Sequence, residues 1–96
     1  MVQQVTITTE SPVSLKPLVE GAIHEELKTL ELGVARTRER LAAFEKQFGM
    51  TSEEFERRFD GNDLQETLDF LDWSGEIEML KLLEPRYQAL RGAHIS

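Results

Sequence analysis

The sequence predicts a mainly α-helical protein, built as an antiparallel hairpin of two long helices that a short helix joins. Three features predict this fold: a long run without a helix breaker, a strong capping signal after it, and a second long run of periodic apolar residues. The chain has 96 residues, 40% hydrophobic and 30% charged, which suits a single domain of amphipathic helices.

The first long helix is expected over residues 14–48. Ser14 can cap its start, Pro17 is tolerated in the first turn, and Gly49 can end it. Its apolar positions alternate in spacings of four and three, which is the heptad pattern of a helix that packs along a narrow seam. The predicted seam consists of Ile23, Leu27, Leu30, Val34, Thr37, Leu41, Phe44 and Phe48.

A short helix is expected over residues 52–59. Thr51 and Glu54 stand at the spacing of a capping box, in which each side chain bonds the backbone N–H of the other residue. Met50 and Phe55 flank this pair as a hydrophobic staple. This short helix would reverse the chain between the two long ones.

The second long helix is expected over residues 64–91, with Asp63 and Glu66 as its capping pair and a kink near Pro85. Its apolar residues cover more surface than one seam requires. We therefore expect a second body to cover the remainder, most simply another copy in a homodimeric four-helix bundle. The alternative is a monomer in which the short helix and the N-terminal segment cover that surface.

Residues 2–9 predict a short β-strand, because β-branched Val5 and Ile7 alternate with threonines. A strand needs a partner. The candidates are the same strand of another copy and the short tail at residues 93–95.

Charge is concentrated in one part of the chain, which carries a net charge of −7. The segment from Glu53 to Glu78 contains ten acidic residues. Its only basic residues are Arg57 and Arg58. Such a segment repels nucleic acid and attracts a basic protein. A DNA-binding role is therefore an unfavoured alternative.

A candidate partner-binding patch lies within that acidic segment. Asp69, Asp72 and Glu76 share one helix face, and Trp73 beside them could anchor a basic partner. The alternative is a solvated acidic face with Trp73 turned into the core.

Enzymatic chemistry has no candidate constellation in this sequence. There is no cysteine and no glycine-rich phosphate loop, and His24 with Glu20 is too small a set for a metal site. We therefore expect no catalytic residues, no cofactor and no metal. No apolar run is long enough to cross a membrane, and no secretion signal is evident, so a cytoplasmic protein is expected.

One block of the sequence resembles a known group of proteins. It comprises residues 48–55, Arg58 with Phe59, an acidic loop, and Asp69-Phe70-Leu71-Asp72-Trp73. This block resembles small uncharacterised bacterial and archaeal proteins associated with toxin–antitoxin gene pairs, over roughly residues 20–91. The resemblance implies an antitoxin-like protein that neutralises a basic toxin. The other reading of the sequence is a purely structural homo-oligomer.

Overall fold

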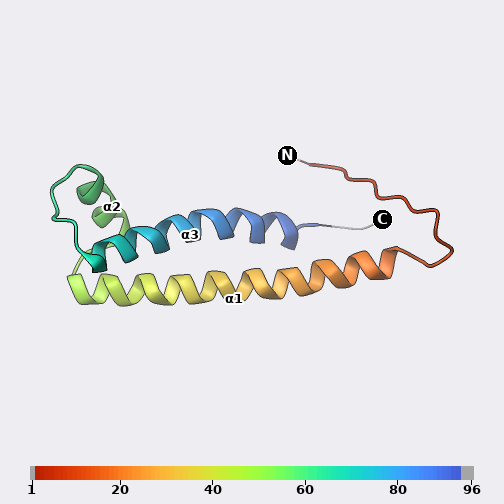
Figure 1. The fold of residues 1–96 in the computed structure, drawn as a ribbon, viewed down its shortest axis with the longest axis horizontal. Coiled ribbons are helices and arrows are strands. Elements are labelled where there is room, and N and C mark those ends of the chain that lie inside the picture. The colour runs from red at the N-terminus through yellow and green to blue at the C-terminus, as the bar shows by residue number, and fades with distance from the viewer. Residues whose placement is uncertain (1, 94–96) are drawn as a thin grey trace.

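The computed structural model describes residues 2–93 and has the predicted helical hairpin (Figure 1). Two long helices lie side by side, α1 (Lys16–Phe48) and α3 (Leu68–Arg91), and the short α2 (Ser52–Asp60) closes one end. The molecule is elongated, with extents of 60 × 23 × 18 Å. The mainly helical fold class is confirmed.

Helix α1 begins two residues later than predicted. Leu15 is its N-cap residue and no side chain caps it, so the expected cap at Ser14 is wrong. Pro17 still stands in the first turn, where it removes no helical hydrogen bond. At the other end Gly49 adopts the left-handed conformation, with φ of 68°, and donates its N–H to the carbonyl of Glu45.

Helix α2 is fixed by the capping signal that the sequence carries. The Thr51 hydroxyl accepts a hydrogen bond from the backbone N–H of Glu54 at 3.1 Å. Glu45 of α1 accepts a second bond, at 2.6 Å, from the backbone N–H of Ser52. These bonds satisfy two of the four backbone N–H groups that a helix leaves free at its start, and they stabilise the turn between α1 and α2.

Helix α3 begins at Leu68, not at residue 64, which corrects the prediction from Asp63 and Glu66. Thr67 caps it instead, accepting from the N–H of Phe70 at 3.1 Å. Residues 61–67 form a loop, and Leu64 in that loop packs against the hydrophobic core. Leu64 therefore buries its side chain without belonging to the helix.

Pro85 lies inside α3, and the helix continues past it to Arg91. Helix α1 is longer than α3, so its first turns extend beyond the end of α3 (Figure 1). These turns have no helical neighbour among the described residues.

The predicted strand over residues 2–9 is not formed in this single chain. These residues have no regular secondary structure, and their side chains are exposed. The reason is that a strand needs a hydrogen-bonding neighbour, and residues 2–93 contain no other strand. The alternative partner at residues 93–95 lies mostly outside the described residues.

Candidate protein-binding surface

The seam residues of α1 all face inward. Leu30, Thr37 and Leu41 are buried, and the remaining five are half-buried. Ion pairs flank the seam, with Arg40 Nε 3.2 Å from Glu76 Oε1 and Arg38 Nη2 2.7 Å from Glu84 Oε1. These pairs agree with the antiparallel register in which the seam packs α3 on α1.

An aromatic joint holds the three helices together at the α2 end. It contains all five phenylalanines and the single tryptophan of the chain: Phe44, Phe48, Phe55, Phe59, Phe70 and Trp73. The rings of Phe55 and Trp73 stack with centroids 4.0 Å apart and an interplanar angle of 4°. Phe44 also stacks on Trp73, at 5.5 Å.

Trp73 lies at the centre of this joint with 0% of its surface exposed. Its indole Nε1 donates a hydrogen bond of 3.0 Å to the hydroxyl of Ser52 in α2. The candidate patch therefore loses its aromatic anchor, because a fully buried ring cannot contact a partner. The acidic face and the tryptophan are separate features, although they are adjacent in sequence.

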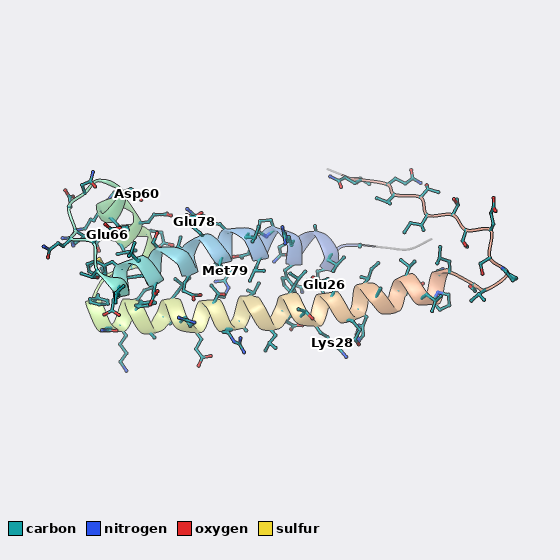
Figure 2. The ribbon with its side chains drawn as sticks, in the orientation of Figure 1. Glu26, Lys28, Asp60, Glu66, Glu78 and Met79 are labelled. Carbon is teal, nitrogen blue, oxygen red and sulfur yellow. The ribbon has the colours of Figure 1, made fainter. Side chains whose placement is uncertain are left out.

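The three acidic residues of the patch have different surroundings. Asp69 and Asp72 are exposed, whereas Glu76 is half-buried against α1 through its ion pair with Arg40. Figure 2 shows that Asp60 and Glu66 also lie at the α2 end. Within residues 2–93, no ion pair involves Asp60, Asp63, Glu66, Asp69 or Asp72. This end of the molecule is therefore an exposed acidic surface.

A second apolar surface runs along α3, which we call the outer stripe. Its large residues are 44 to 81% exposed and are Leu68, Leu71, Met79 and Leu82. Each lies two or five positions from Trp73 or Ile77, which places it about 140° to 160° around the helix from those buried side chains. The outer stripe thus points away from the core.

Gly75 lies between Leu71 and Met79 on the outer stripe, and a Cβ added to it would meet no atom within 4 Å. A glycine inside a helix costs about 1 kcal/mol relative to alanine. Within one chain, no close contact at Gly75 offsets this loss of helix stability.

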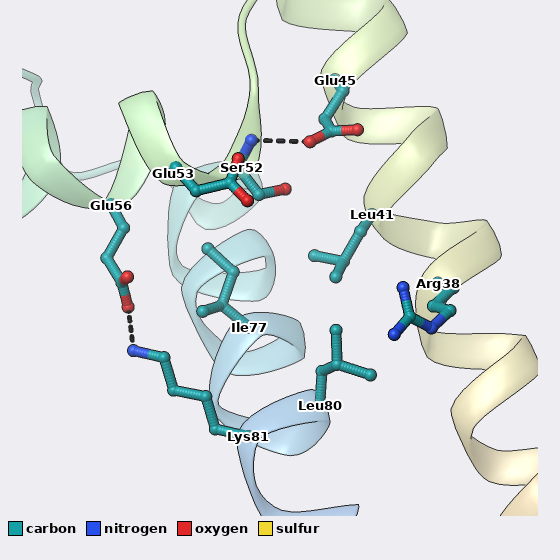
Figure 3. A pocket seen from close by; sticks show the side chains of 9 residues that line it. All are labelled: Arg38, Leu41, Glu45, Ser52, Glu53, Glu56, Ile77, Leu80 and Lys81. Carbon is teal, nitrogen blue, oxygen red and sulfur yellow. Dashed lines mark hydrogen bonds and ion pairs between the residues drawn. The ribbon is translucent and has the colours of Figure 1, made fainter. Parts of the chain in front are cut away.

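An open hollow of about 300 Å³ lies between the three helices (Figure 3). Its floor is apolar and consists of Leu41, Ile77 and Leu80. Its rim is charged and includes Arg38, Lys81 and three glutamates. It holds no nucleophile paired with a base.

Lys81 bridges α3 to α2 at the rim of this hollow. Its ammonium donates to Glu56 Oε2 and lies 3.6 Å from Glu78 Oε1 (Figure 3). The hydrogen bond to Glu56 raises the pKa of Lys81 above its ordinary value of 10.5, against partial desolvation, and the charges of both glutamates add to the rise. This contact ties α2 to α3 outside the aromatic joint.

Two further findings concern the part of the chain that the structure describes. No three histidine, aspartate or glutamate side chains come close enough together to hold a metal ion. No helix combines the length and apolarity needed to cross a membrane.

Sequence reasoning missed the aromatic joint and the role of Ser52 as acceptor for Trp73. The signal for the joint was present, since every phenylalanine falls within residues 44–70, close to the two chain reversals. The outer stripe was foreseen only as surplus apolar area, not as one face.

Comparisons with family models, curated proteins and solved structures found no match to this chain.

Proposed function

We propose that the protein is a protein–protein interaction module whose outer stripe on α3 is covered by a second copy of the same chain. The observation that carries this proposal is the pair of opposed apolar faces on one helix. One face packs on α1 through Trp73 and Ile77, and the other exposes Leu71 and Leu82. A helix that is apolar on both faces normally has neighbours on both.

The surface area of the chain supports a second body. The accessible surface is 7670 Å² for a mass of 11.0 kDa. A compact monomer of this mass exposes about 5,600 Å². The excess of about 2,000 Å² exceeds the roughly 800 Å² that each partner contributes to an ordinary stable interface.

A second copy fits the outer stripe because the stripe is complementary to itself. In an antiparallel pairing of two α3 helices centred near Ile77, Leu71 of one copy lies opposite Leu82 of the other. Gly75 then lies opposite Met79, so a residue without a side chain receives a long one. A parallel pairing would instead place Gly75 opposite Gly75 and like charges together.

The oligomeric state tests this proposal. We expect wild-type protein to sediment as a dimer, and Leu82→Glu to sediment as a monomer with unchanged helix content. Leu32→Glu is the matched control, since Leu32 is an exposed leucine on the side of α1 that faces away from the seam. A wild-type monomer, or dissociation by Leu32→Glu alone, would contradict the proposal.

A second candidate function is the neutralisation of a basic protein, as the toxin–antitoxin resemblance implies. The specific observation that favours it is the exposed acidic surface at the α2 end, where Asp69 and Asp72 lie outside any ion pair among residues 2–93. Electrostatic attraction would speed the encounter with a basic partner and would weaken as salt is added.

Co-expression with the basic product of a neighbouring gene tests this second candidate. Asp69→Asn with Asp72→Asn should weaken the complex more than Glu31→Gln with Glu39→Gln, which removes the same charge from exposed positions of α1. If both double variants weaken the complex equally, the effect comes from the net charge of the protein and not from this acidic surface. No complex at low salt would end this candidate without affecting the homodimer.

A further inference from the structure

The open hollow between the three helices combines an apolar floor with a charged rim (Figure 3). Leu41 and Ile77 of the floor are buried, and Leu80 beside them is half-buried. Its volume of about 300 Å³ lies at the lower limit of small-molecule sites, which range from about 300 to 1,000 Å³. An open space of this size suits one long side chain of another protein better than a whole cofactor.

Both cations of the rim are already paired with glutamates of the chain itself. Arg38 Nη2 lies 2.7 Å from Glu84 Oε1. The Lys81 ammonium donates to Glu56 and lies 3.6 Å from Glu78 Oε1, so two carboxylates share one positive charge. The pairs at the rim therefore leave negative charge in excess, and neither cation is free to attract an anion.

Two further carboxylates of the rim have no cation of their own. Glu53 is exposed in the first turn of α2, and Glu45 uses one oxygen to accept the N–H of Ser52 at 2.6 Å. Within residues 2–93, no ion pair involves either glutamate. Figure 3 shows both of them at the α2 side of the hollow, with Ser52 between them. The hollow thus carries unpaired negative charge beside an apolar floor.

We propose that this hollow is the docking site for a long cationic side chain, arginine or lysine, of a basic partner protein. The inference rests on the second candidate function, the neutralisation of a basic protein, and names the place and the chemistry of that recognition. Such a side chain packs its aliphatic stem on the floor and keeps its charged head at the rim. There the head can donate to Glu45 and Glu53, and a guanidinium has enough donors for both.

Other side chains match the hollow less well for a physical reason. An anionic side chain would meet two unpaired carboxylates, and the repulsion would oppose binding. A purely apolar side chain could cover the floor but would leave the carboxylates without a partner and take water away from them. Only a side chain with an apolar stem and a positive head complements both parts.

The hollow stays accessible in the proposed homodimer. Ile77 points towards the hollow and the core, whereas Leu71 and Leu82 of the outer stripe lie on the opposite side of α3. One chain can therefore pair through its outer stripe and bind a basic partner through the hollow. The exposed acidic surface at the α2 end would add long-range attraction to the same partner.

A capped arginine, acetyl-arginine methylamide, tests the chemistry of the hollow. Its control is acetyl-citrulline methylamide, which has nearly the same shape and no charge. We expect the arginine probe to shift the methyl resonances of Leu41, Ile77 and Leu80 saturably in the full chain. It should bind about three- to fivefold more tightly than the citrulline probe, because an exposed charge pair contributes that much. Methylguanidinium, which has the charge without the stem, should bind more weakly than the capped arginine.

Glu53→Gln measures the contribution of the unpaired carboxylate. It should weaken binding of the arginine probe about threefold, because the charge is removed while the size of the side chain is kept. Asp60→Asn is the matched control, since it removes the same charge from an exposed position at the other end of α2. It should weaken binding clearly less. Circular dichroism should show unchanged helix content in both variants.

The possible outcomes separate this proposal from the function on which it rests. Equal binding of both probes, or an arginine probe that leaves the floor methyls unshifted, would show that the hollow is not the docking site. The same conclusion follows if the co-expressed complex forms and Glu53→Gln weakens it no more than Asp60→Asn; the basic partner then binds elsewhere, and the second candidate function stands. If no complex forms at low salt, the basic partner is lost and the docking site with it.

Discussion

Trp73 shows at the scale of a residue how one side chain can couple three helices. Its ring lies between Phe44 of α1 and Phe55 of α2, while its indole N–H bonds Ser52. The aromatic contacts are broad and tolerant, whereas the hydrogen bond is directional. The Ser52 bond therefore adds a directional contact between α2 and α3 to the aromatic packing.

Removing the Ser52 hydroxyl should therefore destabilise the fold out of proportion to its size. Ser52→Ala leaves the fully buried Trp73 N–H without an acceptor, and we expect a loss of about 1 to 3 kcal/mol in the free energy of unfolding. Ser14→Ala serves as the control and should be neutral, because Ser14 is exposed and caps no helix. Urea titration followed by tryptophan fluorescence measures both, and equal effects would argue against the Ser52 contact.

Lys81 predicts a dependence of stability on alkaline pH. Its pKa is raised in the folded protein, so its contribution is complete below the unfolded pKa of about 10.5 and is lost as pH rises through the folded value. We expect Glu56→Gln to destabilise the protein slightly at about pH 7 and less at about pH 11. Glu39→Gln, at an exposed position outside the ion pairs of residues 2–93, should show no such change. A pH-independent effect of Glu56→Gln would contradict the contact.

At the scale of helices, the three elements have termini of different quality. Threonines cap α2 and α3, whereas α1 begins at Leu15 without a side-chain cap. The start of α1 also lies beyond the end of α3, so neither capping nor packing holds it (Figure 1). We expect the first turns of α1 to open before the aromatic joint does.

Two glycines of α1 make a matched test of helix packing. A Cβ at Gly21 would meet no atom within 4 Å, whereas one at Gly33 would lie 3.2 Å from Leu83 Cδ1 of α3. Gly21→Ala should raise the free energy of unfolding by about 0.5 to 1 kcal/mol through helix propensity. Gly33→Ala should gain clearly less, because Leu83 must shift to admit the methyl group. Equal gains in chemical denaturation would show that α3 is not so close at Leu83.

At the scale of the whole molecule, the hairpin is too extended to act as an ordinary globule. Its radius of gyration is 18.8 Å, where a compact domain of this length has about 12 to 13 Å. The hydrophobic core is gathered at the α2 end around Trp73 and Phe55, and the opposite end has no comparable cluster among residues 2–93. A hairpin of this shape would gain stability from a partner that binds only its folded state.

Thermal unfolding should consequently depend on protein concentration. For a dimer that unfolds to separate chains, we expect the melting temperature to rise by roughly a few degrees for each tenfold increase in concentration. Leu82→Glu should remove this dependence, while Leu32→Glu should retain it. A wild-type melting temperature that is independent of concentration would favour a self-sufficient monomer.

The sequence by itself determined the helices, because heptad spacing, the Thr51 cap and Gly49 are local signals that act within a few residues. It also predicted the seam positions, each of which is buried or half-buried in the structure. It placed the start of α3 wrongly, since Asp63 and Glu66 imitate a cap that Thr67 provides.

The tertiary structure alone decided what each apolar residue of α3 touches. Trp73 turned inward because stacking on Phe55 and the bond to Ser52 satisfy both its ring and its N–H, which an acidic surface would not. Leu71 and Leu82 were left on the opposite face because one neighbouring helix can cover only one side of α3. The sequence thus shows how much apolar surface there is, and the packing shows which part of it still needs a partner.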